Sequence, residues 1–340
     1  MVIEERNPAA AHESTPLLEV RHLVTQIPLE DGSVVTAVND LSFSLARGES
    51  LALVGESGSG KSMSALSLMG LVPGRGRVVE GEILFGGRNL RTLPRGEMQR
   101  VRGWEIGMVF QDPATSLNPV LTIGQQLTEG LREHRRLSKE VLRAQAADLL
   151  HLVGIPDVQR RLDDYPHRFS GGQRQRIMIA MAVSCSPSLL IADEPTTALD
   201  ATIQAQIVEL LKELQKRLSM AILWISHDLA LVAGLVDRVA VMYAGSIVEQ
   251  SPVHDLFKRP RHPYTLGLLR SMPRSNARPL GGEEGLIPIP GHPPDPRART
   301  PGCPFSPRCS MVIDRCRAER PALVPVDPGH DAACFRSAEL

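Results

Sequence analysis

Apolar residues in the first part of the chain follow the spacing of β-strands. Residues 17–53 alternate apolar and polar positions with turn signals between them, which predicts a series of short strands. Continuous apolar runs at 51–54, 189–192 and 221–225 are typical of strands that are buried on both faces. These runs predict the core strands of a largely parallel sheet.

Between the apolar runs, the spacing of apolar residues changes to that of helices. Helices are predicted at 63–69, at 138–153, from Ser170 onward and at 202–217. A shorter amphipathic helix is predicted at 262–269, where Pro263 suits the first helical position. Strands that alternate with helices indicate an α/β fold.

The composition changes after about residue 272. Thirteen of the 27 prolines lie between Pro273 and Pro328, and four of the five cysteines follow Gly302. Proline has no backbone N–H and a fixed φ, so this stretch is predicted to hold neither helices nor central strands. Proline content alone leaves two alternatives open, a disordered tail and an ordered extension.

Charge and hydropathy limit the classes of partner and the compartment. Lys+Arg and Asp+Glu both number 38, so no net positive field draws the chain to nucleic acid or anionic lipid. No apolar run approaches the ~20 residues of a membrane-spanning helix, and residues 1–16 lack the apolar stretch of a secretory signal. We therefore expect a cytoplasmic protein with reduced cysteines.

A glycine-rich turn follows the apolar run at 51–54 and precedes the first predicted helix. It matches the pattern G-x-x-x-x-G-K-[ST], whose backbone N–H groups surround phosphate oxygens at a helix N-terminus. Lys61 is expected to reach the β- and γ-phosphates of a nucleotide, and the Ser62 hydroxyl to bind Mg²⁺. The motif comprises Gly55, Glu56, Ser57, Gly58, Ser59, Gly60, Lys61 and Ser62.

Two carboxylates end the apolar run at 189–192. A buried acid needs a partner that offsets its desolvation, and a Mg²⁺ ion beside the phosphate loop is such a partner. We expect Asp193 to organise the metal and Glu194 to activate water as a general base.

The stretch Phe169-Ser170-Gly171-Gly172-Gln173 resembles the L-S-G-G-Q signature of the ATP-binding-cassette (ABC) family, with Phe169 in place of the usual leucine. The resemblance covers about 17–273. It implies that Ser170, Gly171, Gly172 and Gln173 contact the γ-phosphate bound to the phosphate loop of a second cassette, in a head-to-tail dimer that encloses two ATP molecules.

The resemblance assigns three further residues by their order along the chain. Gln111 is similar to the Q-loop glutamine, which contacts Mg²⁺ and water, so that Ser62, Gln111 and Asp193 form the expected metal set. Asp200 is similar to the D-loop aspartate at the dimer seam, and His227 to the switch histidine that reaches the γ-phosphate. One departure is that no aromatic residue precedes Phe43, so the adenine is expected to meet only an apolar wall near Ile27 or Val38.

The family implies a P-loop NTPase cassette with a RecA-like parallel-sheet core, an antiparallel β subdomain and a helical signature subdomain. We expect a flexible N-terminus at 1–16 and a nucleotide-binding domain at 17–272. Its helical subdomain is expected at about 112–181, and a Pro- and Cys-rich extension at 273–340.

Two stretches resemble the oligopeptide, dipeptide and nickel importers of this family. They are 111–119, after the Q-loop glutamine, and 262–269, after the cassette. The resemblance implies an ATP-hydrolysing subunit on the cytoplasmic face of the cell membrane. Its implied partners are two permease subunits, a second and different cassette, and a solute-binding protein. It implies di- or oligopeptides as the imported cargo, with nickel chelates and other solutes as alternatives.

Two other functions compete with transport. A soluble cassette ATPase of DNA repair or translation usually carries two cassettes or a coiled-coil insertion, and neither a second cassette nor heptads occur here. A catalytically inactive cassette is disfavoured because Lys61, Ser170, Glu194 and His227 are all present.

Four cysteines, Cys303, Cys309, Cys316 and Cys334, are spaced C-x5-C-x6-C-x17-C, which suggests one four-thiolate site. Structural zinc favours pairs two to four residues apart, whereas an iron–sulfur cluster accepts varied spacing. The family resemblance also points to a [4Fe–4S] cluster, with zinc and unligated thiols as alternatives. Cys185 lies apart and is expected to fill the core.

Overall fold

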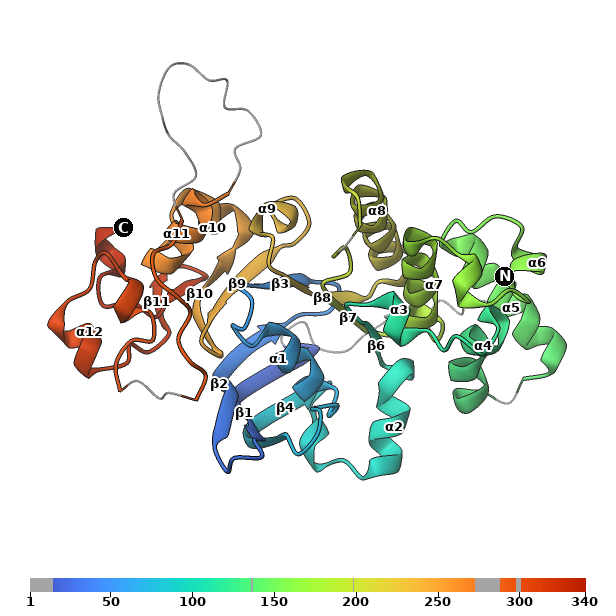
Figure 1. Cartoon of the computed structure of the whole chain (residues 1–340), viewed down its shortest axis with the longest axis horizontal. Helices are drawn as coiled ribbons and strands as arrows, with labels where there is room; N and C mark the ends of the chain where they lie inside the picture. The colour runs from blue at the N-terminus through green and yellow to red at the C-terminus, as the bar shows by residue number, and fades with distance from the viewer. Residues whose placement is uncertain (1–14, 136, 198, 273–287, 298–300) are drawn as a thin grey trace, which may run out of the picture. The chain divides into compact units, whose positions relative to one another are not determined.

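The computed structural model describes residues 15–135, 137–197, 199–272, 288–297 and 301–340 (Figure 1). The predicted flexible N-terminus at 1–16 therefore lies almost entirely outside the described residues. The chain divides into two compact units, each of which is described by itself. The first comprises Met1–Leu17, Leu45–Glu49 and Thr92–Trp224, and the second comprises Leu18–Ser44, Ser50–Arg91 and Ile225–Leu340.

Parallel strands form the core of the first unit. Strand β7 (Leu189–Asp193) pairs in parallel with β6 (Ile106–Val109), and β8 (Ala221–Ser226) lies on the other side of β7. The side chains of β6 and β7 are buried along their whole length. The apolar runs at 189–192 and 221–225 are thus confirmed as core strands.

Helices make up most of the remaining first unit. The predicted helices at 138–153, after Ser170 and at 202–217 are confirmed as α5, α7 and α8. Helix α7 lies so close to β6 that a Cβ atom on Gly107 would come within 2.2 Å of the Ala182 carbonyl oxygen. The seven α-helices that the structure describes in this unit are α2 (Arg95–Trp104), α3 (Pro113–Ser116), α4 (Ile123–His134), α5 (Lys139–Leu152), α6 (Val158–Arg161), α7 (Gly171–Val183) and α8 (Ala201–Leu218).

An antiparallel sheet opens the second unit. Its order is β2 (Val34–Leu45), β1 (Leu18–Pro28), β4 (Arg77–Phe85) and β5 (Arg88–Asn89). The strands predicted within 17–53 are confirmed, although β1 and β2 are longer than expected, at 11 and 12 residues. A register shift between Arg21 and Thr25 lets the long β1 bend and stay paired with β4.

A second sheet in this unit positions the phosphate loop. Strand β3 (Ser50–Val54) is buried and pairs in parallel with β9 (Arg238–Tyr243). Strand β10 (Ser246–Pro252) continues the sheet antiparallel to β9. Ser50 fixes the start of β3, because its backbone N–H and its hydroxyl both donate to the Asp237 carboxylate at 2.8 and 2.6 Å. The α-helices here before residue 273 are α1 (Lys61–Leu68), α9 (Leu229–Val232), α10 (Val253–Lys258) and α11 (Pro263–Arg270).

The C-terminal extension adds two strands to this sheet and a short helix beside it (Figure 1). Strand β12 (His330–Ala332) lies between β10 and β11 (Val324–Asp327), and α12 spans Asp314–Ala318. The prediction that the extension holds neither helices nor central strands was therefore wrong. Its prolines avoid the inner strand, and Pro325 lies in β11 at the sheet edge, where a missing N–H costs little.

A buried contact between two side chains joins β12 to β10. His330 Nε2 lies 2.7 Å from Glu249 Oε1, and the two side chains are only 2% and 0% exposed. The same Glu249 oxygen accepts the backbone N–H of Arg261 at 2.6 Å. A polar group this deeply buried depends on its hydrogen-bond partners, so the pair fixes the extension to the sheet.

We predict that His330→Ala lowers the free energy of unfolding by about 1–3 kcal/mol, because it removes the side-chain hydrogen-bond partner of the buried Glu249. Urea denaturation followed by circular dichroism measures this change. The matched control is Arg317→Ala, which removes an exposed partner of Asp314 from the same extension. Equal effects of the two substitutions would contradict a structural role for the buried pair.

Candidate active site

The phosphate loop, residues 55–62, takes a backbone conformation that only glycine adopts readily at three positions. Gly55, Gly58 and Gly60 have φ angles of 155, 79 and 102°. Space is also lacking, because a Cβ atom would come within 2.3 Å of the Met242 oxygen at Gly55 and 2.4 Å of the Ala37 oxygen at Gly60. Backbone atoms of β9 and β2, which both belong to the second unit, therefore fix this turn.

Several polar groups lie in the loop. Helix α1 begins at Lys61, and no side-chain hydrogen bond caps it. The buried Lys61 ammonium donates to the carbonyls of Gly55 at 2.8 Å and Glu56 at 3.0 Å. Within the described residues, the Ser59 hydroxyl is buried without a hydrogen-bond partner. A helix start beside an ammonium and a buried hydroxyl is a chemistry that suits an anion.

The Glu56 side chain has a partner that the sequence does not suggest. Arg308 Nη1 and Nη2 donate to its two carboxylate oxygens at 2.6 and 2.9 Å. This two-point hydrogen bond raises the pKa of Arg308 above its ordinary value. The backbone N–H of Glu56 donates to the hydroxyl of Tyr264 at 2.9 Å. Tyr264 and Arg308, which lie 208 and 252 positions further along the sequence, thus hold this part of the loop.

The expected switch histidine lies in the second unit. His227 follows β8 and is exposed. The next residue, Asp228, caps α9 by accepting the N–H groups of Ala230 and Leu231. The cap fixes the backbone beside His227.

In the first unit, the strand end carries the expected acids. Asp193 is the last residue of β7 and is 5% exposed. Glu194 has a φ of 46°, the left-handed region that non-glycine residues rarely occupy. Its Oε2 accepts hydrogen bonds from Gln111 Nε2 at 3.1 Å and from Thr197 Oγ1 at 2.8 Å. The structure thus brings Gln111 and Glu194 together and adds Thr197, which the sequence analysis did not select.

The signature residues begin α7 in the same unit. The exposed Ser170 accepts the N–H of Gln173 through its hydroxyl, and the Gln173 side chain accepts the Ser170 N–H, which forms a capping box. Gly172 leaves room for Ile203, since a Cβ atom would come within 2.8 Å of Ile203 Cγ2. Asp200 caps α8 by accepting the N–H of Ile203 at 3.0 Å.

The predicted residues are therefore divided between the units. Residues 55–62 and His227 belong to the second unit, whereas Gln111, Asp193, Glu194, 170–173 and Asp200 belong to the first. The second unit thus carries the glycine-rich loop with Lys61, and the first carries the neighbouring carboxylates of Asp193 and Glu194.

The four cysteines of the extension line one small cavity, together with Phe305 and Met311 among others. Burial raises the pKa of the Cys303 and Cys309 thiols and raises that of Cys334 to about 11. In the described residues, no group of three or more His, Cys, Asp or Glu side chains is arranged to hold a metal ion. The expected cluster site is thus not confirmed, although its four thiols share a cavity. Cys185, by contrast, is buried in the first unit as expected.

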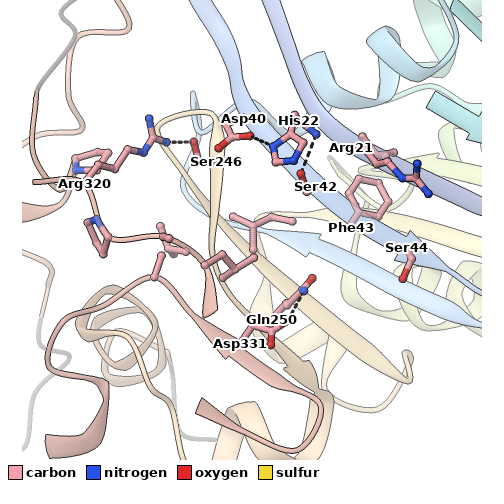
Figure 2. Close-up of a pocket in the computed structure, with 18 of the residues that line it drawn as sticks. Arg21, His22, Asp40, Ser42, Phe43, Ser44, Ser246, Gln250, Arg320 and Asp331 are labelled. Atoms are coloured by element: carbon pink, nitrogen blue, oxygen red, sulfur yellow. Dashed lines mark hydrogen bonds and ion pairs between the residues drawn. The ribbon is translucent and has the colours of Figure 1, made fainter. Parts of the chain in front are cut away.

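A second cavity of about 610 Å³ lies between the antiparallel sheet, β10 and the extension (Figure 2). Arg320 reaches Ser246 on one side, and Gln250 Nε2 donates to Asp331 Oδ2 at 2.7 Å on another. His22 Nδ1 lies 2.7 Å from Asp40 Oδ1 at the exposed rim. Polar side chains from β10 and the extension thus meet around this cavity, which is separate from the residues predicted to bind nucleotide.

Family models match two parts of the chain. Residues 38–197 match the model described as ABC transporter, and residues 248–316 match the model described as oligopeptide/dipeptide transporter, C-terminal region. Among solved structures, a dimeric ATP-binding cassette bound to ADP and phosphate is similar, with a TM-score of 0.62 and 26% identity. The likeness covers 69% of this chain and 98% of that one.

Curated relatives match over almost the whole chain. The oligopeptide transport ATP-binding protein OppD of Haemophilus influenzae is 48% identical over 95% of this chain and 98% of its own length. OppD of Escherichia coli is 47% identical over 98% of this chain and 96% of its own length. The dipeptide transport ATP-binding protein DppD of Bacillus subtilis is 50% identical over 89% of this chain and 90% of its own length. The chain has the ABC cassette fold and belongs to the ABC transporter ATPases, in the branch of the oligopeptide and dipeptide transport ATP-binding proteins.

Proposed function

We propose that this chain hydrolyses ATP to drive the import of di- or oligopeptides by an ABC transporter. The observation that carries the proposal is the pairing of a glycine-held phosphate loop with a C-terminal region that matches oligopeptide and dipeptide transporters. The named relatives favour peptides over nickel chelates as cargo. They also favour transport over DNA repair or translation.

In this proposal, residues 55–62 bind the phosphates of ATP. The loop N–H groups and the start of α1 surround the oxygens, while Lys61 exchanges its two loop carbonyls for the β- and γ-phosphates. Ser62 and Asp193 hold Mg²⁺, with Gln111 as the third residue of the set. The adenine binds without an aromatic partner, near Ile27.

Glu194 activates the water that attacks the γ-phosphate. Hydrogen bonds from Gln111 and Thr197 hold one of its carboxylate oxygens and so fix the orientation of the carboxylate. Its left-handed backbone is strained, and strain of this kind is common where a side chain must be aimed at a reacting group. His227 is the residue that makes a further polar contact with the γ-phosphate.

Hydrolysis requires a second cassette. Ser170 is exposed at the start of α7, and Gly171 and Gly172 follow it half-buried, which suits the γ-phosphate on the partner cassette. ATP then favours the closed cassette pair, and hydrolysis reopens it.

The remaining partners supply the membrane pathway. No helix in the described ranges is both long and apolar enough to cross a membrane. In the proposal, two permease subunits provide the pathway, a solute-binding protein delivers the peptide, and this chain docks peripherally on the cytoplasmic face.

We predict that Glu194→Gln lowers ATP turnover of the assembled transporter by about 10²–10⁴, the usual contribution of a positioned base, while ATP binding persists. Phosphate release and equilibrium binding of ATP measure the two effects separately. Lys61→Ala is expected to weaken binding itself. The matched control is Glu213→Gln, an exposed glutamate on α8 whose loss should change neither value. Turnover at the normal rate in Glu194→Gln would refute the assignment.

We also propose that Cys303, Cys309, Cys316 and Cys334 hold a [4Fe–4S] cluster, which would supply a covalent crosslink for the extension when bound. Their shared cavity supports this assignment. So do the backbone N–H groups of Met311 and Arg336, which donate to the sulfurs of Cys309 and Cys334 at 3.3 and 3.4 Å. Such N–H donors favour the thiolate over the thiol.

Anaerobically purified protein is therefore predicted to contain about four irons and four sulfides per chain, with the broad visible absorption of an iron–sulfur cluster. Cys316→Ser is expected to lose the iron, whereas Cys185→Ser, a buried cysteine outside the extension, retains it. Colourless protein with one zinc per chain, or metal content that Cys316→Ser leaves unchanged, would contradict the cluster.

A further inference from the structure

The phosphate loop contains a negative charge where its ligand is also negative. Glu56 is the second residue of the loop, and its side chain is 28% exposed. A carboxylate beside a triphosphate repels it, by an amount that grows as water is excluded from the site. The loop therefore needs a cation that neutralises Glu56 without occupying the phosphate position.

Arg308 of the extension is placed for this task. Its guanidinium donates to both carboxylate oxygens of Glu56, and its side chain is only 4% exposed. A planar guanidinium with two parallel hydrogen bonds fixes the orientation of a carboxylate as well as its charge. Lys61, the other nearby cation, donates to the backbone carbonyls of Gly55 and Glu56.

The extension and α11 hold Arg308 and Glu56 in turn. Arg308 Nε donates to the carbonyl of Pro290 at 2.8 Å, which fixes the far side of the guanidinium. Tyr243, Tyr264 and Phe305 form an aromatic cluster, with ring centroids 4.7 to 5.3 Å apart, which packs beside this contact. The Tyr264 hydroxyl accepts the Glu56 N–H, so both the side chain and the backbone of Glu56 are held.

We propose that Arg308 is a positioning residue for ATP. It neutralises Glu56 and holds the phosphate loop in its binding conformation, so that nucleotide affinity depends on the folded extension. The inference rests on the proposed ATP site. A loop that is already ordered loses no further conformational freedom when ATP binds, which is the general advantage of preorganisation. Because coupling between sites is reciprocal, bound ATP must also stabilise the segment that carries Arg308.

The test measures equilibrium binding of ATP to the full-length chain, by displacement of a fluorescent ATP analogue. Arg308→Met is expected to raise the Kd for ATP about tenfold or more, since it leaves the Glu56 charge uncompensated. The double variant E56Q/R308M is expected to bind more tightly than Arg308→Met alone, because the repelling charge is gone. A purely structural role for Arg308 would not give this recovery. Arg308→Lys, which keeps the charge but loses the fork, is expected to lie between the wild type and Arg308→Met.

Arg317→Met serves as the matched control, because this arginine lies in the same extension and forms an exposed ion pair with Asp314. It is expected to bind ATP like the wild type. Lys61→Ala distinguishes a failure of the proposed nucleotide site from a failure of the role proposed for Arg308. Normal ATP binding in Lys61→Ala would overturn the proposed nucleotide site, whereas loss in Lys61→Ala with normal binding in Arg308→Met would overturn only the role of Arg308.

A second measurement uses only the wild-type chain, so it tests the proposal even if Arg308→Met fails to fold. Hydrogen–deuterium exchange of the wild-type chain is expected to slow at residues 303–309 when Mg²⁺ and ATP are added. Exchange in that segment that ATP leaves unchanged, while residues 55–62 become protected, would contradict the coupling.

Discussion

The phosphate loop depends on the absence of side chains at Gly55 and Gly60. The backbone of β9 and β2 approaches these glycines so closely that a single added carbon atom would collide with a carbonyl oxygen. This contact fixes the turn that leads from β3 into α1, and a turn at a helix start is the place where the proposed phosphate binding would benefit from backbone donors. The sheet of the second unit can thus be understood as the support that keeps this turn in shape.

Charge is handled differently at the two ends of the loop. Lys61 donates to carbonyls of the loop in the described structure, and those contacts are exchangeable for phosphate oxygens. The Glu56 carboxylate is instead locked by Arg308, a residue outside the region that matches the ABC transporter model. The extension therefore takes part in the electrostatics of the loop, in addition to extending the sheet through β12. Its buried Glu249–His330 pair and its contact with Glu56 belong to the same compact unit.

Local patterns in the sequence were sufficient to predict the core strands and the long helices. The runs at 189–192 and 221–225 consist only of apolar residues, and Ser170 with Gln173 forms the capping box that begins α7. Contacts between residues far apart in the chain could not be predicted this way. The pairing of Glu56 with Arg308 spans 252 positions, and neither residue has a local signal for the other. The pairing of β12 with β10 could not be predicted either, because the three residues of β12 carry no local pattern that identifies their partner strand.

The candidate site was more predictable than its surroundings, because motif residues must keep their order along the chain. Gln111 and Glu194 were selected separately and share a hydrogen bond, whereas Thr197 carries no motif and was missed.

In the proposed pair of cassettes, one cassette supplies the phosphate loop and the other supplies the signature helix. The structure of the assembled transporter with Mg²⁺ and a non-hydrolysable ATP analogue tests this division. We expect the γ-phosphate on Lys61 to contact the signature serine of the partner cassette, and Ser170 to contact the nucleotide held by that partner. A closed, nucleotide-filled pair in which Ser170 contacts no phosphate would contradict it.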